Sequence, residues 1–130
     1  MAEAERRLAA IMFTDIIGYT SLTQSNEALA LKLLEKHREL IRPVLLTYGG
    51  REVKTIGDAF LVEFASALRA TECAVEMQRV LRDYNQTSEH RILIRVGIHV
   101  GDVIHAQGDV YGDAVNIASR IEPQAQGGEI

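Results

Sequence analysis

Apolar and polar residues follow two different spacings along this chain, and these spacings predict an order of strands and helices. The nearly continuous apolar run at residues 8–15 is typical of a central strand covered on both faces. Apolar residues at helical spacing predict a helix over residues 26–48, which Ser25 or Asn26 can cap. Pro43 lies inside that pattern, so we expect the helix to be kinked or divided there.

Residues 53–64 predict a β-hairpin whose two-residue turn is Gly57-Asp58. With that turn, Val53 faces Val62 across the hairpin. Alternation along a strand then directs one set of side chains toward a core: Val53, Thr55, Phe60, Val62 and Phe64. Lys54 lies on the opposite face and Asp58 lies at the tip. An ordinary hairpin with a solvated lysine and a turn-forming aspartate also fits this stretch.

A second helix and a second long strand are predicted after the hairpin. Ser66 can cap a second amphipathic helix that runs to about Tyr84. Strict alternation of apolar residues predicts a strand over residues 92–100, and Gly101-Asp102 is then expected to turn the chain into a short strand at residues 103–104. The two histidines that flank this turn, His99 and His105, are expected at the surface, and they lack a third ligand that would favour a metal site.

A short helix from Asp113 to about Glu122 completes the predicted order. Before it, the chain reads strand, helix, strand, strand, helix, strand, with an added hairpin strand. This order predicts the α+β class: a ferredoxin-like split βαβ (βαββαβ) palm, in which helices pack on an antiparallel sheet. At 130 residues, the chain 1–130 is expected to form one domain.

The amino-acid composition argues against several classes of function. Hydrophobic residues make up 47% and charged residues 25% of the chain, as in ordinary soluble domains. The net charge of -4 does not provide the excess of basic residues that is typical of proteins that bind nucleic acid. No apolar stretch of the sequence is long enough to span a membrane. Cys73 is the one cysteine and lies in an apolar stripe, so a buried thiol and a reducing, cytoplasmic location are expected.

Several polar residues occupy positions from which they can carry chemistry. Asp15 ends the first strand, where it is either a ligand or the cap of the next helix. Asn116 and Arg120 are four residues apart and share one helix face, with Asp109 a few residues upstream. Such a pair is also common on solvated helix faces, so spacing alone leaves both interpretations open.

Four stretches together resemble the catalytic domain of the class III nucleotidyl cyclases, which make cyclic nucleotides from nucleoside triphosphates. They read FTDIIGYTSL at residues 13–22, GGREVKTIGDAFLVEF at 49–64, RVGIHVGDV at 95–103 and DVYGDAVNIASRIE at 109–122. The resemblance runs from about Leu8 to the end of the chain. Four motifs in one order at compatible spacings make it specific, although each motif alone is weak.

The resemblance implies a metal site and a phosphate site. Asp15 and Asp58 match two carboxylates that hold two Mg²⁺ or Mn²⁺ ions, with the carbonyl of Ile16 as a backbone ligand. Backbone N–H groups at the start of the following helix would suit the triphosphate. These belong to Ile17, Gly18, Tyr19 and Thr20.

The resemblance also implies roles for four polar side chains. Asn116 matches a residue that orients the ribose, and Arg120 matches one that stabilises charge on the phosphorus. Lys54 and Asp109 match the pair that reads the base. A donating lysine and an accepting aspartate complement the N1 acceptor and 6-amino donor of adenine, so ATP is the expected substrate.

Members of this family work as head-to-tail dimers, so a homodimer with interfacial active sites is expected, with possible regulatory domains in a longer chain. The family domain continues past residue 130 with further strands, one bearing a phosphate-contacting lysine, and residues 127–130 (GGEI) would begin the next strand. A truncated, non-catalytic nucleotide-binding or regulatory module is therefore the alternative function. A diguanylate cyclase is disfavoured, because Arg51 puts a positive charge where its hairpin needs a metal ligand.

Overall fold

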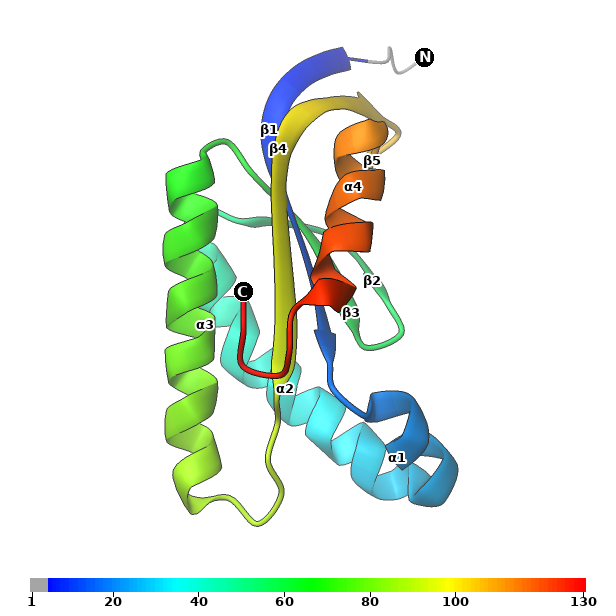
Figure 1. Ribbon diagram of the computed structural model, residues 1–130, viewed down its shortest axis with the longest axis vertical. Helices are drawn as coiled ribbons and strands as arrows, with labels where there is room; N and C mark the ends of the chain where they lie inside the picture. The colour runs from blue at the N-terminus through cyan, green and yellow to red at the C-terminus, as the bar shows by residue number, and fades with distance from the viewer. Residues whose placement is uncertain (1–4) are drawn as a thin grey trace.

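Five antiparallel strands form one sheet in the order β2-β3-β1-β4-β5 (Figure 1). The computed structural model describes residues 5–130. The strands are β1 (Glu5–Ile16), β2 (Arg51–Ile56), β3 (Ala59–Phe64), β4 (Ile94–Ala106) and β5 (Asp109–Tyr111). The helices are α1 (Tyr19–Ser25), α2 (Glu27–Thr47), α3 (Ala67–Thr87) and α4 (Asp113–Ile121), followed by the 3₁₀ turn η1 (Glu122–Gln124). The order of elements confirms the predicted α+β split βαβ plan.

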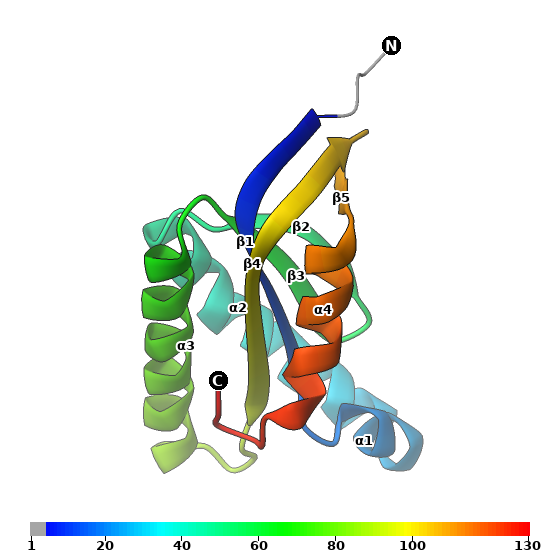
Figure 2. The same cartoon turned by 45° about the horizontal axis from the view of Figure 1, so that its top comes forward.

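The helices cover the two faces of the sheet unequally. The long helices α2 and α3 pack on one face over the main core, and α4 lies across the other face (Figures 1 and 2). Both long helices begin where their caps were predicted: the Asn26 side chain accepts from the N–H of Leu29 at 3.1 Å, and that of Ser66 accepts from the N–H of Arg69 at 3.3 Å. Among residues 5–130, no helix is long and apolar enough to cross a bilayer.

Pro43 does not divide α2, which runs as one helix from Glu27 to Thr47. Of the two expected effects of Pro43, division of the helix is therefore wrong, and a kink stays a prediction. Proline removes only one helical hydrogen bond, and Ile41, Val44 and Leu45 around it are buried in the main core. The packing of this face outweighs the local cost of the proline.

The hairpin forms around Gly57-Asp58 as predicted, but its register is shifted by a β-bulge between Glu52 and Lys54. Val62 therefore pairs with Glu52 and not with Val53. Val53 packs beside α4 in the second core, on the face opposite to the predicted one. The core residues predicted in β3 are buried against α2 and α3, as expected: Phe60, Val62 and Phe64.

Strand β4 continues through Gly101-Asp102, so the turn predicted there is wrong. The pairing of β4 with β1 extends without interruption from Ile16 opposite Ile94 to Glu5 opposite His105, and these cross-strand bonds override the local turn signal. The chain turns instead at Gln107-Gly108, where both residues have positive φ, 55° and 78°.

Three close contacts fix the end of the sheet at which β4 begins. A side chain at Gly97 would place its Cβ 2.6 Å from the backbone of Glu122, so glycine allows η1 to pack directly on β4. The N–H of Gly128 donates to the carbonyl of Ile94 at 2.8 Å, and the N–H of Val96 donates to that of Glu129 at 3.1 Å. Residues 127–130 thus lie along β4 without forming the regular strand that was expected there.

Candidate active site

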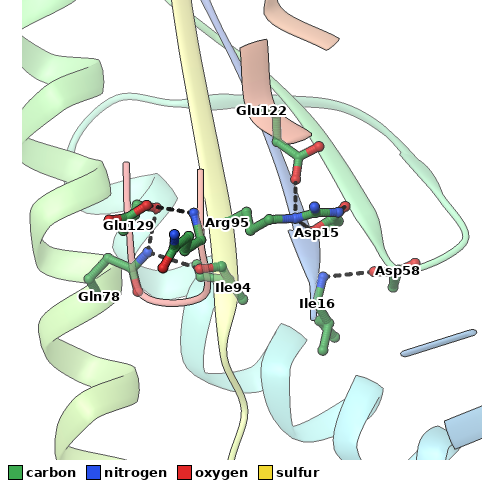
Figure 3. Close-up of polar contacts among 9 residues, drawn as sticks. Asp15, Ile16, Asp58, Gln78, Ile94, Arg95, Glu122 and Glu129 are labelled. Carbon is green, nitrogen blue, oxygen red and sulfur yellow. Dashed lines mark hydrogen bonds and ion pairs between the residues drawn. The ribbon is translucent and has the colours of Figure 1, made fainter. Parts of the chain in front are cut away.

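Asp15 forms a bidentate ion pair with Arg95, its direct partner in the adjacent strand β4. The guanidinium Nη2 lies 2.6 Å and Nε 3.0 Å from the two carboxylate oxygens (Figure 3). The hydrogen bond to Asp15 raises the pKa of Arg95 above its ordinary value. In this state, Arg95 engages both oxygens of the predicted metal ligand.

Asp58 is tied to the same end of β1. Its Oδ2 accepts a hydrogen bond from the N–H of Ile16 at 2.7 Å, so the hairpin tip is held beside the residue that follows Asp15 (Figure 3). Two distant segments, 42 residues apart, thereby bring together Asp15, Ile16 and Asp58. These are the three residues for which the sequence predicts metal binding.

Glu122 lies on the other side of Arg95. Its Oε1 is buried and lies 3.2 Å from the Arg95 Nε, but no donor among residues 5–130 is aligned to give it a hydrogen bond. Burial, and next the nearby Asp15, raise the pKa of Glu122 to about 7. Arg95 and Glu122 could not be assigned to this site from the sequence, because their proximity to Asp15 depends on strand register and on the packing of η1.

The residues at this end fit a site for hard divalent cations. The available donors are two carboxylates and a backbone carbonyl, which are the ligands that Mg²⁺ and Mn²⁺ prefer. Carboxylates of Asp15, Asp58 and Glu122 surround the one guanidinium of Arg95, which favours a further cation. Within residues 5–130, no group of three acidic, histidine or cysteine side chains is placed to hold a metal ion by itself. An open site of this kind keeps positions for water and substrate oxygens.

Four backbone N–H groups at the start of α1, those of residues 17–20, were expected to contact the triphosphate, and one of them is already paired. The N–H of Ile17 donates to the carbonyl of Leu93 at 2.8 Å, so it does not point to a ligand. Gly18 precedes α1 in the left-handed conformation, with φ of 76°. Among residues 5–130, no acceptor pairs with the N–H groups of Gly18, Tyr19 or Thr20, which remain the candidates for a phosphate contact.

Lys54 and Asp109 form an ion pair, with 2.8 Å between the lysine Nζ and the carboxylate Oδ2. They come from β2 and β5, the two opposite edges of the sheet, so the sheet curls to bring its edges together on the α4 side. The hydrogen bond from Lys54 lowers the pKa of Asp109 below its usual range. The Lys54 side chain is 43% exposed, which leaves the pair open to a ligand.

Asn116 and Arg120 share one face of α4, as their spacing predicts, and this face points outward. Ala114 and Ala118 on the same helix are buried against the sheet, whereas Asn116 and Arg120 are exposed. Neither side chain has a hydrogen-bond or ion-pair partner within residues 5–130. The predicted site residues thus fall into three groups, at the end of β1, across the curled sheet edges and on the surface of α4.

Comparison with known proteins identifies the family that has this arrangement. A family model described as the adenylate and guanylate cyclase catalytic domain matches residues 2–130. The chain belongs to this family. A crystal structure of an adenylate/guanylate cyclase/hydrolase from Silicibacter pomeroyi shares 41% sequence identity and superposes with a TM-score of 0.89, covering 97% of this chain and 75% of that one.

Relatives in the cyclase family carry both adenylate and guanylate names. The putative adenylate cyclase 3 of Rhizobium meliloti is 38% identical over 128 residues, which cover 96% of this chain. The guanylyl cyclase Cya2 is 29% identical, with a TM-score of 0.86, and the match covers 98% of this chain and 74% of that structure. The chain spans only 22% of the length of the Rhizobium protein.

Proposed function

We propose that this chain is an adenylate cyclase catalytic domain, which converts ATP to 3′,5′-cyclic AMP and pyrophosphate in signal transduction. The observation that carries the choice of base is the Lys54–Asp109 pair, whose donor and acceptor lie 2.8 Å apart. Adenine offers an acceptor at N1 and a donor at its 6-amino group, so it satisfies both side chains. Guanine presents the opposite pattern and would leave each group unpaired, at a cost of about 1–3 kcal/mol per group.

The end of β1 would hold two Mg²⁺ or Mn²⁺ ions through Asp15, the Ile16 carbonyl and Asp58. Bound there, the ions supply activation of the ribose 3′-hydroxyl and screening of charge at the α-phosphate. In the reaction, the 3′-hydroxyl loses its proton to water, its oxygen bonds to the α-phosphorus, and the bond from that phosphorus to pyrophosphate breaks, with no covalent enzyme intermediate. Arg95 must release Asp15 for the ions to bind, and Glu122 is the nearest carboxylate that can receive it.

Asn116 and Arg120 would orient the ribose and stabilise charge on the five-coordinate phosphorus. Both are exposed and lack partners among residues 5–130, which suits groups that contact a ligand or a second subunit. We place the active sites between two copies of the chain. One copy supplies Asp15 and Asp58, and the other supplies Lys54, Asp109, Asn116 and Arg120. A cytoplasmic location belongs to the same proposal, because that compartment supplies ATP and keeps Cys73 reduced.

The test is a change of base preference. Lys54→Glu combined with Asp109→Ser should weaken the use of ATP and raise the relative use of GTP. The first substitution replaces a hydrogen-bond donor by an acceptor, and the second replaces a carboxylate, which only accepts, by a hydroxyl that can also donate. Cyclic AMP and cyclic GMP formation would be measured with Mn²⁺, and calorimetric binding of ATP and GTP gives the same comparison without turnover. Lys36→Glu with Glu39→Ser is the matched control, because that exposed pair lies on α2. Unchanged preference for ATP in the Lys54 and Asp109 variant would contradict the assignment.

A further inference from the structure

A second polar cluster lies beside the Lys54–Asp109 pair and belongs to none of the groups described so far. At its centre is Glu63 of β3, whose side chain is only 11% exposed. Its Oε1 accepts from the Arg51 Nε at 3.1 Å, and its Oε2 contacts the Nε2 of His105. His105 is 14% exposed at its side chain and was wrongly expected at the surface. The cluster thus joins β2, β3 and β4 on the α4 side of the sheet.

The contact between Glu63 and His105 is not a product of strand pairing. In the register, Glu63 pairs with Ile11, and Ile11 pairs with His99. His105 lies six residues further along β4, so the upper part of β4 must bend over the sheet for its ring to reach Glu63. Figure 2 shows this bend, with the upper ends of β1 and β4 turned toward the side of α4 and β5.

The bend at His105 also fixes the position of Asp109. The two residues belong to one tight hairpin, in which His105 pairs with Val110 and Ala106 pairs with Asp109. The turn between them has only two residues, Gln107 and Gly108. A hairpin this short transmits the position of one strand to the other, so anchoring His105 to β3 carries Asp109 toward Lys54.

Apolar packing alone does not explain this placement. Val103 and Val110 bury the inner side of the hairpin in the second core, but apolar contacts are non-directional and tolerate sliding. The carboxylate of Glu63 is directional, because each of its oxygens has a different partner. A buried carboxylate that loses its partners is costly, which favours the one arrangement that satisfies it.

We propose that Glu63, held by Arg51 and His105, is a positioning residue that keeps the β4–β5 hairpin curled over the sheet, so that Asp109 meets Lys54 and the two can select the base. The inference rests on the proposed reading of the base by Lys54 and Asp109. It adds a specificity determinant that does not itself touch the nucleotide.

The test compares two identical substitutions on the same hairpin. Glu63→Gln removes the charge from the cluster, whereas Glu52→Gln removes it from a similar bidentate pair with Arg42, at 2.9 and 3.1 Å. In Glu63→Gln, the ratio of ATP to GTP use should fall by about tenfold or more, mainly through a higher KM for ATP. In Glu52→Gln, the ratio should stay as in the wild type.

A second measurement follows the carboxyl of Asp109 in the protein without bound nucleotide. The carboxyl of Asp109, followed by carbon NMR, should titrate below its usual range in the wild type and in Glu52→Gln. In Glu63→Gln it should return toward its ordinary pKa as the contact with Lys54 loosens. Circular dichroism and thermal melting confirm that each variant is folded. If Glu63→Gln does not fold, His105→Val removes the same contact from the other side, and His105→Gln, which keeps a donor, should restore it.

The outcomes separate this inference from the proposed function. A wild type without preference between ATP and GTP would overturn the assignment of Lys54 and Asp109 as base readers. A wild type that prefers ATP, together with folded variants of Glu63 and His105 that keep the same preference and the same Asp109 titration, would overturn the positioning role alone.

Discussion

His37 provides a sharp test of the core, because it is a fully buried histidine without a polar partner. Its side chain lies on the sheet-facing side of α2, and its ring centroid is 5.3 Å from that of Phe60. Neither ring nitrogen has a hydrogen-bond partner among residues 5–130. Burial, and next the charges of Arg38 and Arg42, lower the pKa of His37 from 6.5 to about 4.

The direction of the pH effect follows from this lowered pKa. The folded protein holds His37 neutral, whereas the unfolded chain takes up a proton below pH 6.5. The stability that a neutral His37 contributes is therefore complete above pH 6.5 and is lost as the pH falls toward 4. By pH 4.5 the loss is about 2.5 kcal/mol for this one residue.

His37→Leu should remove this pH dependence and stabilise the protein at pH 7 by about 1 kcal/mol, because two unpaired polar atoms leave the core. Urea unfolding at pH 7.0, 5.5 and 4.5 would measure the free energy of unfolding of both proteins, and the acidic groups they share cancel in the difference. His90→Leu is the matched control for the loss of a histidine, because the His90 side chain is exposed and lies outside the core. Parallel pH curves for the wild type and His37→Leu would refute the reasoning.

Two further predictions concern the active site. Asp58→Ala and Arg120→Ala should each abolish cyclic AMP formation but restore it when mixed, because each mixed dimer has one intact site; silence at every ratio, with mixed dimers shown to form, would mean that the site lies within one chain. Arg95→Gln should tighten Mn²⁺ binding to the nucleotide-free protein by roughly tenfold, measured by electron paramagnetic resonance, because the guanidinium no longer competes for Asp15. Weaker binding than in the wild type would contradict that competition.

Local signals in the sequence predicted most of the fold. The helical spacing and the caps at Asn26 and Ser66 located α2 and α3, and alternation located the first half of β4. The errors arose where distant pairing overrides a local signal. Gly101-Asp102 is a turn signal in isolation, but β1 is long enough to keep β4 one continuous strand through it. The extra residue of the bulge at Val53 leaves no trace in an alternating pattern.

The sequence motifs proposed individual candidate residues for the site, but they did not predict the contacts between those residues and their neighbours. The sequence proposes Asp15, Asp58, Lys54 and Asp109 as candidates; the structure places Asp58 against the N–H of Ile16, next to Asp15, and Lys54 against Asp109. The partner of Asp15 was not identified, because Arg95 is one of several polar residues in an alternating strand. Only the register of β1 against β4 distinguishes it from its neighbours.

The bulge in β2 has a consequence for how two copies of such a domain can meet. An edge strand exposes unpaired backbone groups, and a flat one can recruit a strand from another molecule. At β2 the extra residue breaks the regular ladder and increases the local twist, while Arg51 and Lys54 place charge along the edge. The β2 edge is thus a poor template for strand-to-strand aggregation of the folded domain.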